Sequence, residues 1–139
     1  NIMGMADLHD SNEHYLMAIY EIEEEGVPVK RARIAQRLNI SAPSVTKHIH
    51  RMENQKLVSA KASNIIALTS SGRKIAVGVV RRHRLAECLL VDIIGLTKDD
   101  AHVEADRWEH AISEKVEKKI AKVLGNPKYS PDGKKIPVK

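Results

Sequence analysis

The 139-residue sequence has little of several features that common protein classes need. Phenylalanine is absent, and tyrosine and tryptophan total four residues, which disfavours single-strand nucleic-acid binders that stack bases on aromatic platforms. One cysteine cannot form an internal disulfide bond, which disfavours a secreted disulfide scaffold. No apolar run approaches the ~20 residues that span a bilayer, and the acidic first residues lack the basic region of a signal peptide. We therefore expect a soluble cytoplasmic protein with no membrane partner.

Lysine and arginine are missing from the first 26 residues, and charge is uneven throughout the chain. The net +5 divides into −7 over residues 1–26, +12 over 27–84, −3 over 85–126 and +3 over 127–139. A basic block of this size suits a polyanion, either nucleic acid or an anionic membrane surface. The acidic flanks suit cations, and metal ions are among the candidates.

Hydrophobic spacing and capping residues predict a mainly α-helical chain. The expected elements are helices over 10–25, 30–38 and 41–54, short strands over 57–60 and 65–68, and long helices over 70–94 and 98–124. Three helices followed by a hairpin is the order of a winged helix-turn-helix, expected over residues 1–75. A helical domain over 76–139 follows, and its tail from residue 126, rich in proline, is expected to be an extended linker.

The predicted helix over 41–54 has the features of a DNA-reading helix. Its first two turns carry small polar and basic residues that suit a major groove about 12 Å wide. These residues are Ser41, Ser44, Thr46 and Lys47. Lys47 can donate to guanine O6 or N7, and Pro43 can pack against a thymine methyl group. Nearby arginines can neutralise phosphates and so fix register, namely Arg31, Arg33, Arg37 and Arg51.

The competing interpretation is a solvated basic face, which the combination of turn, cap, hairpin and charge block disfavours. Lys61 and Asn64, at the tip of the hairpin, either contact DNA or belong to a plain cover over the core. His48 and His50 are expected at the surface or on the phosphate side of the helix.

Imidazole and carboxylate groups recur at helical spacing in the C-terminal half. His102, Asp106, Glu109 and His110 fall on one stripe of the last predicted helix. His83 and Glu87 lie four residues apart on the preceding helix, and His14 lies near the start of the first. These groups can close around a cation. The alternative is a charged helix face that neighbouring arginines neutralise.

Five segments resemble the diphtheria-toxin-repressor family of metal-dependent transcriptional regulators. They are EEEGVPVKRARIAQRL, SAPSVTKHIHRME, RRHRLAECLLVDIIGL, HVEADRWEHAISEKVEKKIAKVL and NPKYSPDGKKIP. The resemblance covers nearly the whole chain from Leu8 onward. It implies a winged-helix DNA-binding domain followed by a helical domain that forms a homodimer. It also implies a repressor of metal-homeostasis genes, and not an enzyme, that binds an operator in double-stranded DNA when loaded with Fe²⁺ or Mn²⁺.

When the ligand positions of the family are transferred to the matching positions of this sequence, the resemblance implies two sets of metal ligands. The primary set is His14, Asp106, Glu109 and His110, and the ancillary set is His83, Glu87 and His102. Iron-dependent members usually have Met at the position of His14 and Cys at that of Asp106. Because imidazole and carboxylate are harder ligands than thioether and thiolate, the set favours Mn²⁺ or Fe²⁺, while Zn²⁺, Co²⁺, Ni²⁺ or Cd²⁺ can substitute. A further acidic ligand of manganese-selective members falls here on Met17.

The resemblance also implies DNA contacts at Ser41, Pro43 and Lys47, with phosphate contacts near Ser11, Arg31, Ser44 and Thr46. Iron-dependent members continue into a β-barrel domain that lends ligands to the ancillary set. Where such ligands are missing, the ancillary set is expected to need water or another group.

Two other functions stay open at this stage. One is a metal-independent winged-helix regulator that senses an organic ligand. The other is a metal-dependent hydrolase, ranked last because no nucleophile–base pair is evident beside the candidate ligands.

Overall fold

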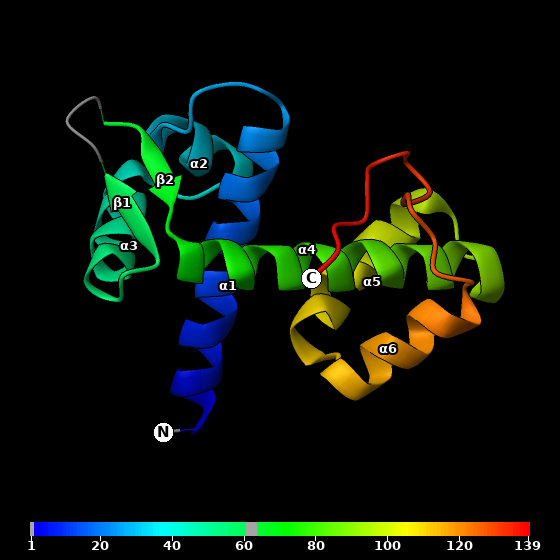
Figure 1. Ribbon diagram of the computed structural model, residues 1–139. Coiled ribbons are helices and arrows are strands. Elements are labelled where there is room, and N and C mark those ends of the chain that lie inside the picture. Colours follow the sequence, from blue (N-terminus) through cyan, green and yellow to red (C-terminus); the bar gives the residue numbers. More distant parts are fainter. Residues whose placement is uncertain (1, 61–63) are drawn as a thin grey trace. The chain divides into compact units, whose positions relative to one another are not determined.

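The computed structural model describes the backbone of residues 2–60 and 64–139, with side chains from residue 10 onward. The elements are α1 (Ile2–Glu24), α2 (Arg31–Leu38), α3 (Ala42–Asn54), β1 (Val58–Ala60), β2 (Ile66–Leu68), α4 (Ser70–Cys88), the π-helix η1 (Leu89–Ile94), α5 (Lys98–Ala111) and α6 (Glu114–Val123) (Figure 1). Two compact units divide within α4, between Ala76 and Val77. None of the helices described is long and apolar enough to cross a membrane.

The first unit is a winged helix-turn-helix, as the sequence predicts. α1 packs on α2, α2 on α3, and α3 on β1, around a core that includes Leu16, Ile34 and Ile49. Asn39 ends α2 in the left-handed conformation with φ 54°, which asparagine tolerates better than most residues. β1 and β2 pair antiparallel, with Ser59 opposite Ala67. The hairpin tip at residue 61 lies outside the described residues, so the expectation for Lys61 has no structural counterpart.

The first helix begins earlier than the sequence predicts. α1 starts at Ile2, whereas the sequence predicts a helix over 10–25, for which Asp10, Ser11 and Asn12 are the candidate N-caps. Cap-forming residues only favour a helix start, and the preceding residues contain Met, Ala and Leu, which favour helix. The expected cap residues are therefore interior helical residues, and their side chains are available for tertiary contacts.

The last predicted helix is two helices in the structure. α5 ends at Ala111, and Ile112 leaves helical geometry with ψ 118°. Ser113 then caps α6, because its side chain accepts a hydrogen bond from the Val116 N–H at 3.2 Å. The prediction of one helix over 98–124 was wrong because it overlooked this internal capping residue.

Ser113→Ala is expected to lower the free energy of unfolding by about 1 kcal/mol, because the first turn of α6 loses its side-chain acceptor. Chemical denaturation of the two chains measures the difference. Ser71→Ala is a control, since Ser71 is exposed in the first turn of α4. A Ser113→Ala chain no less stable than the control would contradict this role for Ser113.

The C-terminal tail packs against the second unit and does not extend away as a linker. Ile136 is 3% exposed within a core that includes Leu85 and Ile120. Backbone pairing joins Tyr129 to Lys135, and the buried Arg84 side chain donates to the Lys135 carbonyl oxygen at 2.6 Å. Composition indicated a linker because prolines disfavour regular structure, but the tail is ordered by tertiary contacts.

Candidate metal centre and DNA-reading surface

Five imidazole and carboxylate side chains meet in the second unit. α4 provides His83 and Glu87, one turn apart, and α5 provides His102, Asp106 and Glu109. His83, Glu87 and Glu109 are buried, with 2%, 5% and 1% of their surface exposed. The side chains of His102 and Asp106 are half exposed. The cluster therefore has a buried floor and an open side, and we call it the His83 cluster.

The donor atoms of the His83 cluster are close together. His83 Nδ1 lies 3.0 Å from Glu109 Oε1 and 3.5 Å from Asp106 Oδ1. His83 Nε2 lies 3.3 Å from Glu87 Oε1 and 3.3 Å from His102 Nδ1. The second Glu87 oxygen lies 3.2 Å from His102 Nδ1. Ligands bound about 2.1 Å from a cation lie roughly 3 to 3.5 Å apart, so these spacings match a coordination shell.

One buried oxygen of the cluster has no hydrogen-bond partner. Glu109 Oε2 is buried and unsatisfied among the described residues, although the imidazole Nε2 of His110 lies 3.9 Å away. A buried carboxylate oxygen without a partner is costly, and a cation would satisfy it. Nitrogen and oxygen donors of this kind suit Mn²⁺, Fe²⁺ and Zn²⁺. The residues present therefore fit a divalent metal ion.

Without a metal ion, His83 compensates the charges of the carboxylates in the cluster. Burial lowers the pKa of His83, but hydrogen bonds to Glu109 and Glu87, with their charges, outweigh burial and raise this pKa to about 10. Burial also raises the pKa of Glu109, with His83 acting in the opposite direction. For Glu87, burial is outweighed by His83 and His102, so its pKa is lowered. At neutral pH a protonated His83 therefore occupies the place where a cation would neutralise the carboxylates.

His83 gives the metal-free chain a predicted pH dependence. Because its pKa is higher in the folded chain than the unfolded value of 6.5, protonation of His83 stabilises the fold fully below pH 6.5, and this contribution is lost as pH rises through about 10. Denaturation at several pH values, with a chelator present, is expected to show this loss. His83→Gln should reduce this pH-dependent loss of stability. His50→Gln, at an exposed residue of α3, should show the same loss as the unmodified chain. Equal pH profiles for both variants would contradict the assignment.

The expected primary and ancillary ligand sets are not separate groups in these contacts. His83, expected in the ancillary set, contacts Asp106 and Glu109, both expected in the primary set. His110 follows Glu109 on α5 and is partly buried. His14 is an exposed residue of α1 in the first unit. Its relation to the α5 residues stays a prediction from the sequence.

The expected DNA-reading residues of α3 lie on its exposed side. Pro43, Ser44, Thr46 and Lys47 are all exposed, while Val45, Ile49 and Met52 are buried. Ser41 is also exposed and caps α3, accepting from the Ser44 N–H at 3.3 Å. Arg31 is partly buried, and its Nε is without a hydrogen-bond partner among the described residues. Ser11 is half-buried on α1.

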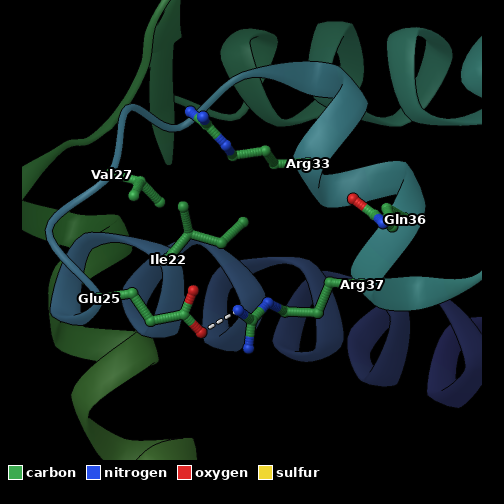
Figure 2. A pocket seen from close by; sticks show the side chains of 6 residues that line it. All are labelled: Ile22, Glu25, Val27, Arg33, Gln36 and Arg37. Atoms are coloured by element: carbon green, nitrogen blue, oxygen red, sulfur yellow. Dashed lines mark hydrogen bonds and ion pairs between the residues drawn. The ribbon is translucent and has the colours of Figure 1, made fainter.

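Two of the arginines expected on phosphates have protein partners. Arg37 forms an ion pair with Glu25, and its Nη1 lies 4.0 Å from Glu21 Oε1. Arg33 donates to the Pro28 carbonyl oxygen. Both arginines line a pocket of about 370 Å³ between α1 and α2, where Figure 2 shows the Glu25–Arg37 pair. A phosphate at Arg37 would have to compete with two carboxylates.

His48 is buried, so the expectation of a surface position was wrong, whereas a place on the phosphate side of the helix stays a prediction. It is 8% exposed, its Nε2 lies 2.8 Å from Asn12 Oδ1, and its ring stacks on Tyr15 at 4.1 Å between centroids. The sequence contains a signal for this, because residue 48 lies three positions after Val45 and four before Met52. That spacing places it beside the buried stripe of α3.

Comparisons with known proteins agree with this division into a reading unit and a metal-binding unit. The profile of the iron dependent repressor N-terminal DNA binding domain matches residues 7–64. That of the iron dependent repressor metal binding and dimerisation domain matches residues 69–138. The iron-dependent repressor of Mycobacterium leprae is 51% identical over 133 residues, covering 96% of this chain and 58% of that protein. The diphtheria toxin repressor of Corynebacterium diphtheriae is 50% identical over 133 residues, which cover 96% of this chain and 59% of that protein.

Solved structures share the fold. A manganese-dependent transcriptional repressor in complex with manganese superposes with a TM-score of 0.85 at 35% identity, covering 91% of this chain and 58% of that one. A hypothetical protein from Sulfolobus solfataricus superposes with a TM-score of 0.68 at 31% identity. The match covers 90% of this chain and 95% of that one. The chain spans about 58% of the length of the Mycobacterium leprae relative. The resemblance predicted from the sequence motifs is confirmed, and the chain belongs to the iron-dependent repressor family.

Proposed function

We propose that this chain is a metal-dependent, DNA-binding transcriptional repressor of metal-homeostasis genes, activated by Mn²⁺ or Fe²⁺. The observation that carries the proposal is the His83 cluster, in which the buried Oε2 of Glu109 has no hydrogen-bond partner among the described residues. The other unit of the chain exposes a polar and basic reading helix. The proposal is supported by relatives that are named iron-dependent repressors and by a structural relative named for manganese. We assign the chain no enzymatic role.

We infer that the candidate carboxylate ligands change partners when metal binds. Without metal, His83 donates to Glu109 and Glu87 and so compensates their charge. A divalent cation, when bound, supplies that compensating charge. Asp106, Glu109 and His110 would then hold it with His14, the ligand set that the family resemblance implies. His83, Glu87 and His102 are the proposed ancillary ligands. Two imidazoles and two carboxylates in the first set favour Mn²⁺ or Fe²⁺, with Zn²⁺, Co²⁺, Ni²⁺ and Cd²⁺ as substitutes.

DNA reading is assigned to α3. Lys47 reaches base edges in the major groove, Ser41 and Pro43 complete the reading face, and Ser44 and Thr46 contact phosphates with Ser11 and Arg31. A homodimer would present two such helices to half-sites about one helical turn apart, or multiples of that spacing. The second unit leaves Ile93, Ile94 and Val103 each 54% exposed, and burying apolar surface of this kind against a second copy would favour dimerisation.

The proposal is tested by adding the protein to duplex DNA that contains candidate operators and measuring binding. The titration is done first with a strong chelator and then with each divalent metal in turn. Binding that requires metal, strongest with Mn²⁺ or Fe²⁺, is expected. Asp106→Ala and His110→Ala should each weaken this metal dependence. Operator binding that persists unchanged in chelator would contradict the proposal and would favour a regulator that senses an organic ligand.

A further inference from the structure

A second pocket of the first unit lies where α1 meets α3. It has a volume of about 310 Å³, and the residues that matter for its chemistry are Ser11, Tyr15, Ser44, Lys47, His48 and Arg51. Two side chains are cationic and three carry hydroxyl groups. None of the residues that line the pocket in the described part of the chain is acidic. Cations with hydroxyl donors and no carboxylate favour a phosphate group.

A polar link holds the two walls of this pocket together. The imidazole Nε2 of His48, on α3, lies 2.8 Å from Asn12 Oδ1, on α1. The amide nitrogen of Asn12 donates to the side chain of Gln55, the C-cap of α3, at 3.0 Å. The His48 ring also stacks on Tyr15 with 13° between the ring planes. Asn12 and Tyr15 therefore fix α1 against α3 at three points.

His48 makes this link in its neutral form. Burial, with a smaller effect of the Arg51 charge, lowers the pKa of His48, so the imidazole is uncharged at pH 7. Since Asn12 Oδ1 can only accept, Nε2 carries the proton of the neutral ring. The positive charge of the pocket then comes from Lys47 and Arg51, and His48 acts through the position of its neighbours.

We propose that His48 is a positioning residue that, through Asn12 and Tyr15, joins α1 to the reading helix and so completes a pocket for one backbone phosphate of duplex DNA. The inference rests on the proposed DNA-binding function. Its consequence is that the α1 wall, with Ser11 and the Tyr15 hydroxyl, contributes to phosphate binding only while His48 holds it in place.

A double-mutant cycle on DNA affinity tests the proposal, using the full chain with Mn²⁺ at fixed salt. In the unmodified chain, Ser11→Ala is expected to weaken binding about three- to tenfold, the effect of one hydrogen bond to a charged group. In a His48→Ala background, Ser11→Ala should have almost no further effect. A purely structural role for His48 predicts the same Ser11→Ala effect in both backgrounds, and that result would overturn the proposal.

Two further variants complete the test. His48→Gln retains a donor for Asn12 and should restore most of the sensitivity to Ser11→Ala, while Asn54→Ala, at the exposed end of α3, should leave affinity unchanged. If His48→Ala fails to fold, Asn12→Ala breaks the same link and replaces it in the cycle. If the unmodified chain does not bind DNA, both the proposed function and this inference are overturned. If it binds DNA but the effects of Ser11→Ala and His48→Ala are additive, only this inference is overturned.

Discussion

Glu109→Gln is expected to weaken Mn²⁺ binding by at least about 10- to 100-fold, the range seen when even outer-shell partners of a metal site are removed. The buried Oε2 of Glu109 has no hydrogen-bond partner in the described part of the chain, and a neutral amide is a much weaker ligand than a carboxylate. Glutamine keeps an oxygen that can accept from His83 Nδ1, so the packing of α4 on α5 should persist. Competition with a chelating dye measures the change.

Glu104→Gln is the matched control for that prediction. Glu104 lies on the same helix, and its carboxylate is 4.0 Å from Arg107, so this variant should bind Mn²⁺ as the unmodified chain does. Circular dichroism of both variants separates a lost ligand from a lost fold. Equal Mn²⁺ affinity in the two folded variants would show that Glu109 is not a ligand.

Gly72→Ala is expected to have the largest effect on stability, a loss of about 3 kcal/mol in the free energy of unfolding, at the upper end for overpacking. A Cβ atom at residue 72 would lie 1.9 Å from the Leu57 carbonyl oxygen and 2.9 Å from its carbon. That oxygen is fixed, because it accepts from the N–H and the hydroxyl of Thr69, at 3.1 and 3.0 Å. Since both clashing atoms are backbone, no side-chain rotation relieves the contact.

Gly78→Ala provides the contrast within the same helix. Its Cβ would meet the end of the flexible Arg82 side chain at 3.2 Å, and alanine favours helix over glycine by about 1 kcal/mol. This variant should be neutral or more stable by up to about 1 kcal/mol. Denaturant melts of the two variants compare them directly, and similar losses in both would refute the close approach at Leu57.

Local signals in the sequence predicted the reading unit well. Serine and proline at positions 41 and 43 are typical of a helix start, and the spacing of Val45, Ile49 and Met52 is typical of a buried helix face. The hairpin followed from a change of period. The start of α1 and the break at Ser113 were missed because capping residues occur both at helix ends and within helices, and tertiary packing decides between these outcomes.

The candidate metal ligands were also found from spacing, but their grouping was not predictable. Helical periodicity places Asp106 and Glu109 on one face of α5, yet it does not say which residue of α4 they meet. The structure shows that both meet His83, which depends on how the two helices cross. His48 is a similar case, because its burial depends on Tyr15 and Asn12, which lie 33 and 36 positions earlier in the chain.

The proposed function requires that metal binding and DNA binding are coupled in this chain, and reciprocal linkage measures this coupling. The Mn²⁺ affinity of the chain is measured with and without saturating operator DNA, and the operator affinity with and without Mn²⁺. Thermodynamic linkage requires both ratios to be the same factor. The proposed function predicts a shared factor well above one, on the order of 5 to 150 for a typical coupling. Mn²⁺ affinity that does not change when operator DNA is bound would contradict a metal-dependent repressor.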